Sequence, residues 1–373
     1  MRPAAPARDR RIDALDGLRG LAAIVVVGRH TLNAAAMSDA TRRTILESPL
    51  GLVLCGDGAV RVFFVLSGWV LAGSLARGRG LRGALQFWVR RVLRIYPPYV
   101  VGVLFSWAAA FVYAGWYAGA LGHPALSEWL ARLGAIHRSF EHLLPFLAFP
   151  GHADIQMPVG WTLYVEMVFS LLLPVLVLAA RPLRGIPLLG VGIALLVLWP
   201  AEYLPAHALD FALGILSFQE RAALQRVLGS LPLAAAGAGV AAAVVLSAAP
   251  VFFGWSIPVD GILITPRDTI SGLLMSLGGW GLVAATLFRP WLRRVLATRP
   301  IVAVGNSAYS LYLFHMPVLL TSALAVHAPL GWPGGIALFA VVLGVSEALA
   351  MAGWRCIERP TIAAGERLSA RLG

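Results

Sequence analysis

Long apolar stretches recur from one end of the chain to the other, and short segments rich in arginine separate them. A helix needs about 20 apolar residues to cross a hydrocarbon core of about 30 Å. The pattern therefore predicts about ten membrane-spanning helices, some of them short. Their expected ranges are 18–37, 60–75, 99–120, 159–180, 186–199, 204–218, 231–253, 269–288, 301–326 and 336–357.

These stretches account for nearly the whole chain. We therefore expect an all-α polytopic membrane protein that forms a single domain over residues 1–373. Residues 1–17 and 358–373 are expected to be cytoplasmic end segments. The arginine-rich segment 77–96 is also expected on the cytoplasmic side, and Pro97-Pro98 is expected to separate it from the span that follows.

A long segment, residues 122–156, follows the third predicted span and is expected on the outer side of the membrane. Within it, residues 137–146 are too short to cross a bilayer and too apolar for a plain loop. We expect them to form a helix that lies along the membrane interface.

Composition supports a membrane protein, because hydrophobic residues make up 59% of the sequence and mean hydropathy is +0.78. The formal net charge is +12, and all 30 basic residues are arginine. Such a balance can indicate nucleic-acid binding. Here the arginines lie mostly in short segments between spans, as the positive-inside rule describes. We therefore predict an inner (plasma) membrane protein with both termini cytoplasmic, and no nucleic-acid partner.

The first predicted span carries Arg19 and, eleven residues later, His30. That separation is about 16 Å along a helix, so His30 would lie near the middle of the membrane. An ionisable group at that depth is costly and marks a pathway or an active site. A neutral imidazole there can take a proton from a hydroxyl and later return it. The alternative is a histidine that only packs between helices and bonds to a carbonyl.

A carboxylate, Glu166, lies inside the fourth predicted span and needs a partner there. It could orient His30, pair with an arginine, or bind an acceptor hydroxyl. The structural alternative is a salt bridge to Arg29 or Arg61.

Arg91 and Arg94 are spaced i, i+3 in FWVRRVLRIYPP, so they share one helical face. Guanidinium groups bind phosphate oxygens through paired hydrogen bonds, and this pair suits a phosphate or pyrophosphate. The alternative is a solvated cytoplasmic loop whose arginines only set the topology.

Small and hydroxyl-bearing residues mark two further spans. Ser67-Gly68 lies in the second, where we interpret Gly68 as a close helix contact. No G-x-S-x-G pattern surrounds Ser67, so a nucleophilic role is weakly indicated. The ninth span, around Ser307–His315, carries Ser, Tyr and His side chains that could serve a site or only join helices.

Several chemistries find no support in the sequence. It has no Walker loop, Rossmann glycine pattern, HExxH or CxxC motif, so ATP-dependent phosphoryl transfer and zinc chemistry are not indicated. We expect no metal.

Taken together, the motifs resemble those of membrane acyltransferase family 3, whose members O-acylate sugars, lipids and envelope polymers. Five blocks carry the resemblance, in order along nearly the whole chain. They are LDGLRGLAAIVVVGRH with the Arg19–His30 spacing, FFVLSG at 63–68, RRVLRIYP at 90–97, WTLYVE at 161–166 and SAYSLYLFH at 307–315. One departure is Arg61, where many members have an acid, so an acidic role at that position is in doubt.

The resemblance implies about ten spans, a cytoplasmic acyl-CoA donor, most simply acetyl-CoA, and a hydroxyl acceptor on a carbohydrate or lipid-linked molecule at the outer side. It implies that His30 is the catalytic histidine, and we add Glu166 as a second catalytic group. The residues expected to bind the donor are Arg19, Arg91, Arg94 and Tyr96. The residues expected to contact the substrate are Asp16, Ser67, Trp161, Tyr312 and His315.

Other classes of membrane protein remain open at this point. Short spans, buried charge and a central histidine also suit a proton-coupled carrier or an exporter of lipid or polysaccharide. No internal inverted repeat is visible in the sequence, which argues against the carrier. A non-catalytic assembly subunit is the third class, and it predicts that His30 can be replaced without loss.

Overall fold

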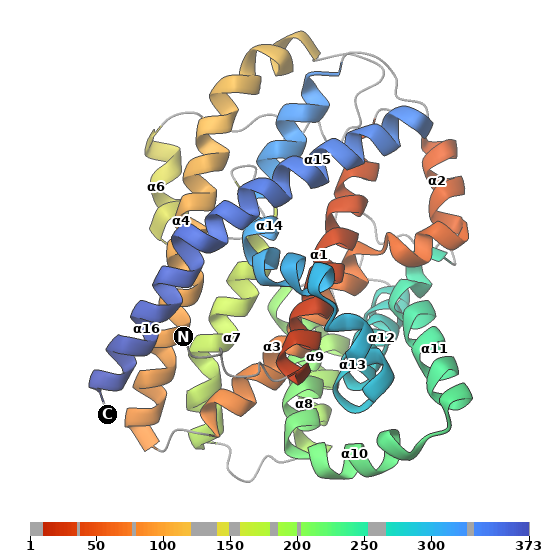
Figure 1. Ribbon diagram of the computed structural model, residues 1–373, viewed down its shortest axis with the longest axis vertical. Helices are drawn as coiled ribbons and strands as arrows, with labels where there is room; N and C mark the ends of the chain where they lie inside the picture. Colours follow the sequence, from red (N-terminus) through yellow and green to blue (C-terminus); the bar gives the residue numbers. More distant parts are fainter. Residues whose placement is uncertain are drawn as a thin grey trace, which may run out of the picture.

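The computed structural model describes residues 10–35, 38–76, 80–120, 140–148, 157–179, 186–199, 203–252, 266–326 and 332–372. Every regular element within these ranges is a helix (Figure 1). The helices of the first half are α1 (Arg10–Ala34), α2 (Asp39–Glu47), η1 (Pro49–Val53), α3 (Gly56–Leu75), α4 (Gly80–Ala120), α6 (Phe140–Ala148) and α7 (Gly160–Ala179). Those of the second half are α8 (Ile186–Leu198), α9 (Tyr203–Gln219), α10 (Arg221–Ser230), α11 (Leu233–Phe252), α12 (Pro266–Phe288), α13 (Pro290–Leu296), α14 (Arg299–Leu324), α15 (Trp332–Gly353), η2 (Trp354–Glu358) and α16 (Arg359–Arg371).

Several of these helices are long and apolar enough to cross a membrane. Within the described residues they are Pro49–Leu75, Gly80–Ala114, Leu233–Pro250, Thr269–Phe288 and Pro333–Arg371, and the shorter apolar helices are Gly160–Pro174 and Pro187–Leu198. The chain is therefore an all-α integral membrane protein, as predicted. The count of about ten spans and the division into a single domain stay predictions.

One helix boundary was predicted wrongly. The arginine-rich segment and the third span form a single helix, α4, which continues through Pro97-Pro98. Proline removes a backbone donor and usually breaks a helix in water. Within a membrane, neighbouring groups can satisfy the carbonyls that proline leaves open. The two prolines leave the carbonyls of Leu93 and Arg94 without their usual donors, and close by the Tyr309 hydroxyl of α14 donates to the Ile95 carbonyl at 2.8 Å, which joins the two helices at this point.

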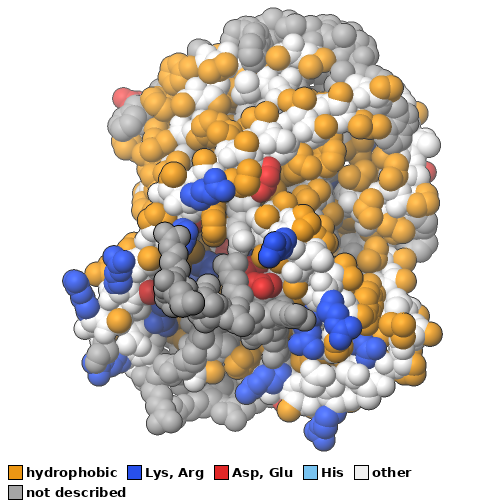
Figure 2. Space-filling view, viewed as in Figure 1, with side chains coloured by type: hydrophobic (Ala, Val, Ile, Leu, Met, Phe, Trp, Pro, Cys, Tyr) orange, Lys and Arg blue, Asp and Glu red, His pale blue; other side chains and the backbone are white. Residues whose placement is uncertain are grey.

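Short helices and a tail complete the connections. The interfacial helix expected at 137–146 corresponds to α6, while most of the surrounding outer segment lies outside the described residues. Most of the predicted end segment 358–373 forms the helix α16, which packs against α4 (Figure 1). On the face shown in Figure 2, basic side chains gather towards the lower end of the molecule, and apolar side chains dominate the rest.

Close helix crossings at glycines fix the centre of the fold. A Cβ atom on Gly305 of α14 would lie 2.1 Å from the Asp16 carbonyl oxygen of α1, so only glycine allows the two helices to meet there. Gly68 of α3 is packed in the same way, since a Cβ there would lie 2.4 Å from the Phe211 carbonyl oxygen of α9. Small residues allow such approaches in membranes, and the predicted packing role of Gly68 is confirmed.

Candidate active site

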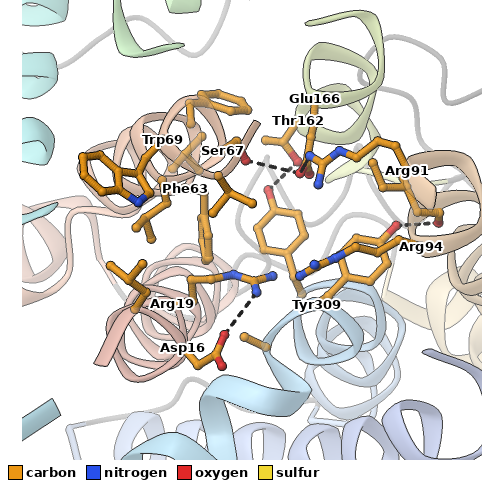
Figure 3. Close-up of a pocket in the computed structure, with 18 of the residues that line it drawn as sticks. Asp16, Arg19, Phe63, Ser67, Trp69, Arg91, Arg94, Thr162, Glu166 and Tyr309 are labelled. Carbon is orange, nitrogen blue, oxygen red and sulfur yellow. Dashed lines mark hydrogen bonds and ion pairs between the residues drawn. The ribbon is translucent and has the colours of Figure 1, made fainter. Parts of the chain in front are cut away.

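A cavity of about 570 Å³ opens between α1, α3, α4, α7 and α14 (Figure 3). That volume falls within the range of small-molecule and cofactor sites. The cavity brings together seven of the residues predicted for the site. These are Asp16, Arg19, Ser67, Arg91, Arg94, Glu166 and Tyr312.

The charge around the cavity is predominantly positive. Among the described residues that line it are Arg19, Arg91, Arg94 and Arg221, against the two carboxylates of Asp16 and Glu166. Arg19 and Arg94 extend towards each other into the open space (Figure 3). Arg19 is paired with Asp16 on its own helix, at 3.6 Å between Nη1 and Oδ1. An excess of guanidinium groups in a concave site favours a ligand with several negative charges.

Glu166 is held by partners from two other helices. Its Oε1 forms an ion pair with Arg91 of α4 and accepts a hydrogen bond from Ser67 Oγ of α3 at 3.3 Å. Arg91 in turn donates from Nε to Ser170 Oγ at 2.9 Å, one turn further along α7. Of the roles considered for Glu166, pairing with an arginine is the one that the structure displays.

The alternative prediction, that Glu166 forms a structural salt bridge with Arg29 or Arg61, was wrong. Arg61 pairs instead with Asp210 of α9, at 3.1 Å between Nη1 and Oδ2. Arg29 forms no ion pair with any described residue. Spacing in the sequence does not reveal which of these side chains meet.

His30 and His315 face each other across the contact between α1 and α14. Nδ1 of His30 lies 2.8 Å from Nε2 of His315, and the two rings are nearly parallel, with an interplanar angle of 8°. Nδ1 of His315 lies 2.8 Å from the Tyr312 carbonyl oxygen and 3.2 Å from that of Leu311. His315 is completely buried.

These contacts assign the tautomers of the neutral pair. A carbonyl oxygen only accepts hydrogen bonds, so the ring proton of His315 belongs on Nδ1. Nε2 of His315 then accepts, and Nδ1 of His30 must donate to it. The lone pair of His30 is therefore on Nε2, the nitrogen that a general base would use.

Tyr312 connects the cavity with the histidine pair. Its ring lines the cavity and lies 5.7 Å from the His315 ring, centroid to centroid. Its hydroxyl is hydrogen-bonded to that of Thr162 at 3.0 Å, and Phe63 meets the ring edge-on. Neither histidine is among the residues that line the cavity.

The remaining predicted residues lie away from the cavity wall. The Tyr96 hydroxyl, expected to contact the donor, donates instead to the Leu147 carbonyl of α6. Trp161, expected to contact substrate, stacks on His207 of α9 with 5.5 Å between ring centroids. Their placement gives no direct support to the predicted roles.

Sequence reasoning missed Arg221 and Phe218, and it left Tyr309 of the ninth span without a definite role; all three line the cavity. Arg221 begins α10 and lies over the Phe218 ring, with its Cζ 4.6 Å from the centroid. It was interpreted only as one of the arginines of a cytoplasmic loop. No local signal distinguishes an arginine that turns into a cavity from one that faces solvent.

A second polar cluster, formed by Arg61, His207, Asp210 and Ser276, was also missed. Asp210 Oδ2 lies 2.9 Å from His207 Nδ1, and Arg61 Nη1 donates to Asp210 Oδ2 and to Ser276 Oγ, the latter at 2.8 Å. All four residues are buried. The signal was an aspartate within the apolar sixth span, three residues after a histidine. We infer that this cluster fixes α9 against α3 and α12.

The described residues form a helical membrane protein with a cationic cavity beside the His30–His315 pair, an arrangement suited to group transfer. The comparisons with known proteins identify the family. A family model described as "Acyltransferase domain" matches residues 12–351. The chain therefore belongs to acyltransferase family 3, as its motifs predict, and it is an acyltransferase that transfers groups other than amino-acyl groups.

Two curated relatives are similar over most of their length. Nodulation protein 10 of Rhizobium leguminosarum bv. viciae is 27% identical over 392 residues, which cover 95% of each chain. Acyltransferase MdmB of Streptomyces mycarofaciens is 28% identical over 353 residues, covering 84% of this chain and 80% of the relative. No solved structure matches the chain. The transporter and assembly-subunit alternatives are accordingly not favoured.

Proposed function

We propose that the protein transfers an acyl group, acetyl in the simplest case, from cytoplasmic acyl-CoA to a hydroxyl of a carbohydrate or other envelope acceptor. The observation that carries the proposal is the cavity itself, where four arginines face two carboxylates and Tyr312 leads to the His30–His315 pair. Coenzyme A carries its phosphates at one end and its reactive sulfur at the other. A cationic cavity that leads to a base suits such a ligand.

Binding of the donor would use charge-assisted hydrogen bonds to phosphate oxygens. Arg94, Arg19 and Arg221 are the groups best placed to supply them, since Arg91 is already engaged by Glu166 and Ser170. Glu166 then has a supporting role, because it orients Arg91 in the cavity wall. The pantetheine arm would pass beside Tyr312 towards His30.

His30 supplies the chemistry as a general base. The acceptor oxygen bonds to the thioester carbonyl carbon while the hydroxyl proton moves to Nε2 of His30. The carbon–sulfur bond then breaks, and the departing thiolate of CoA takes that proton. Nε2 of His315 accepts a hydrogen bond from Nδ1 of His30. This bond stabilises the imidazolium that forms on His30 and holds the His30 ring in a fixed orientation.

The orientation of the chain is part of the proposal. Arginines dominate the segments between spans that the topology assigns to the cytoplasm, and one end of the face in Figure 2 is basic. Both termini would then be cytoplasmic, in the inner membrane. Arg19 at the cytoplasmic end of α1 and His30 near mid-depth would place the donor inside and the acceptor outside.

The experiment uses purified protein in detergent with acetyl-CoA labelled in the acetyl group. Envelope glycolipids and polysaccharide are supplied as the acceptor fraction. We expect CoA release that depends on the acceptor fraction, with label recovered in alkali-labile esters, as O-acetyl groups are. Tight CoA binding without acceptor-dependent release would contradict O-acyl transfer to envelope material, and absence of CoA binding would contradict the donor.

A further inference from the structure

Arg29, the residue immediately before His30, is a cation without a partner among the described residues. Its side chain is partly exposed, but its Nη1 atom is buried and donates a hydrogen bond to none of the described residues. No ion pair with a described carboxylate involves it. A guanidinium group carries five donors, and a buried donor without an acceptor is destabilising.

Two other arginines of the membrane interior show the usual compensation. Arg91 is paired with Glu166, and Arg61 with Asp210. Buried charges in proteins are normally compensated in this way, and intramembrane charges that are not compensated mark functional positions. Arg29 therefore has the character of a group whose partner arrives with a ligand.

Neighbouring residues hold the stem of Arg29 in place. A Cβ atom on Gly56, at the start of α3, would lie 3.1 Å from Cγ of Arg29, so glycine at this position leaves room for the arginine stem. A side chain packed along its methylene groups loses little further freedom when its head group binds an anion.

The position of Arg29 separates it from the donor cavity. It lies ten residues after Arg19 on α1, about 15 Å further along the helix, and it is not among the cavity-lining residues. In the proposed orientation Arg29 lies at nearly the same depth as His30, beyond the donor cavity. The guanidinium group is therefore next to the catalytic base and outside the space proposed for the donor.

We propose that Arg29 binds a carboxylate or phosphate group of the acceptor and so presents its hydroxyl to His30. The inference rests on the proposed function, because it takes His30 as the base. It narrows the acceptor to an anionic one, whose charge comes from an acidic sugar, a sugar phosphate or a phospholipid headgroup.

The test measures thermal melting of the purified protein in nanodiscs, with CoA at saturation so that the donor cavity is occupied. Glucuronate, glucose 1-phosphate and glucose are titrated in nanodiscs of phosphatidylcholine. A separate arm replaces part of the phosphatidylcholine by phosphatidylglycerol. The variants are Arg29→Gln, Arg29→Lys and Arg43→Gln, the last of which removes an exposed charge from α2.

We expect at least one anionic probe to raise the melting temperature of the wild type, whereas glucose does not. Arg29→Gln should abolish that shift, Arg29→Lys should keep part of it, and Arg43→Gln should keep it whole. Without an anion, Arg29→Gln should melt no lower than the wild type, because an uncompensated charge has been removed. The anion that raises the melting temperature identifies whether a carboxylate, a sugar phosphate or a lipid headgroup carries the charge that Arg29 binds.

The inference is overturned if Arg29→Gln retains the anion-induced shift, if no anionic probe stabilises the wild type, or if Arg29→Gln unfolds at a lower temperature than the wild type. The last result would assign Arg29 a structural partner. Melting with and without CoA is recorded separately in each variant. If CoA does not raise the melting temperature of the wild type, the proposed donor is refuted. If CoA does raise it, and the anionic probes raise the melting temperature of Arg29→Gln as much as that of the wild type, only the inference about Arg29 is refuted.

Discussion

The crossing of α1 and α14 at Gly305 provides a sharp test of how packing positions the site. This contact holds Asp16, next to the cavity, and carries His315 ten residues further along α14 towards His30. Replacing Gly305 by alanine places a methyl group 2.1 Å from the Asp16 carbonyl oxygen and 2.4 Å from its carbonyl carbon. Both neighbouring atoms are backbone, so no side chain can rotate away.

The expected magnitude follows from that distance. An ordinary carbon–oxygen contact needs roughly 3.4 Å, so the helices must separate by about 1 Å. A separation of that size would stretch the 2.8 Å contact between His30 and His315 beyond hydrogen-bonding range. Misplacement of catalytic groups by about 1 Å can lower turnover about 100-fold, or about 2.7 kcal/mol of transition-state stabilisation.

The assay is release of CoA from acetyl-CoA at saturating donor, with thermal melting as the test of folding. Gly344→Ala is the matched control, because a Cβ on Gly344 of α15 meets nothing within 4 Å. We expect the control to retain wild-type turnover and Gly305→Ala to lose most of it. A folded Gly305→Ala protein with turnover within about threefold of the wild type would refute the argument that this crossing sets the geometry of the site.

Three further predictions concern donor binding, stability and topology. Replacing Arg94 and Arg221 together by alanine should weaken CoA binding in calorimetry by about two orders of magnitude, since charge-assisted contacts contribute about 1.5–3 kcal/mol each. Unchanged affinity in the folded variant would make them topology determinants only. Asp210→Asn leaves Arg61 buried without a counter-charge and should cost about 3–5 kcal/mol, measured by denaturation, whereas an unchanged midpoint would show that the pair is not needed. Alkaline phosphatase fused after Gly373 should be inactive, while a fusion between the third and fourth predicted spans should be active, and the reverse pattern would overturn the orientation.

The helical membrane fold was predictable because the bilayer imposes it. Backbone groups in hydrocarbon must be satisfied internally, so a long apolar stretch leaves few choices besides a helix. The same constraint explains the error at Pro97-Pro98. A proline that would end a helix in water can be tolerated in a membrane, where neighbouring helices pack on the segment, and α4 continues through Pro97-Pro98 with Tyr309 of α14 bonded to it next to the prolines.

The individual site residues were recognisable, but their partners were not. His30 and Glu166 attract attention because ionisable groups are costly within apolar runs, and Arg91 because its spacing puts it on one helical face with Arg94. Which of them meet depends on the rotation of each helix about its axis and on crossings such as Gly20 with Gly305, where a Cβ on Gly20 would lie 2.7 Å from the Gly305 nitrogen. These features arise from packing between segments that are far apart in the chain.

The cluster around Asp210 shows a different limit. An aspartate in the sixth predicted span, close to His207, was visible in the sequence and could have been weighed as Glu166 was. The two carboxylates differ in their surroundings, since Glu166 lines the cavity and Asp210 is wholly buried among α3, α9 and α12. Only the fold separates the position that faces a ligand from the one that joins helices.

The central claim is that His30 is the base that removes the acceptor proton. The most direct test compares acetyl transfer by the wild type with that of His30→Gln, which keeps a hydrogen-bonding group of similar size but cannot take up a proton at neutral pH. We expect His30→Gln to bind CoA and to melt as the wild type does, yet to transfer acetyl groups about 10²–10⁴-fold more slowly, and His30→Ala to be equally impaired. Substantial transfer by a folded His30→Gln protein would contradict the account and would make His315 the next residue to test.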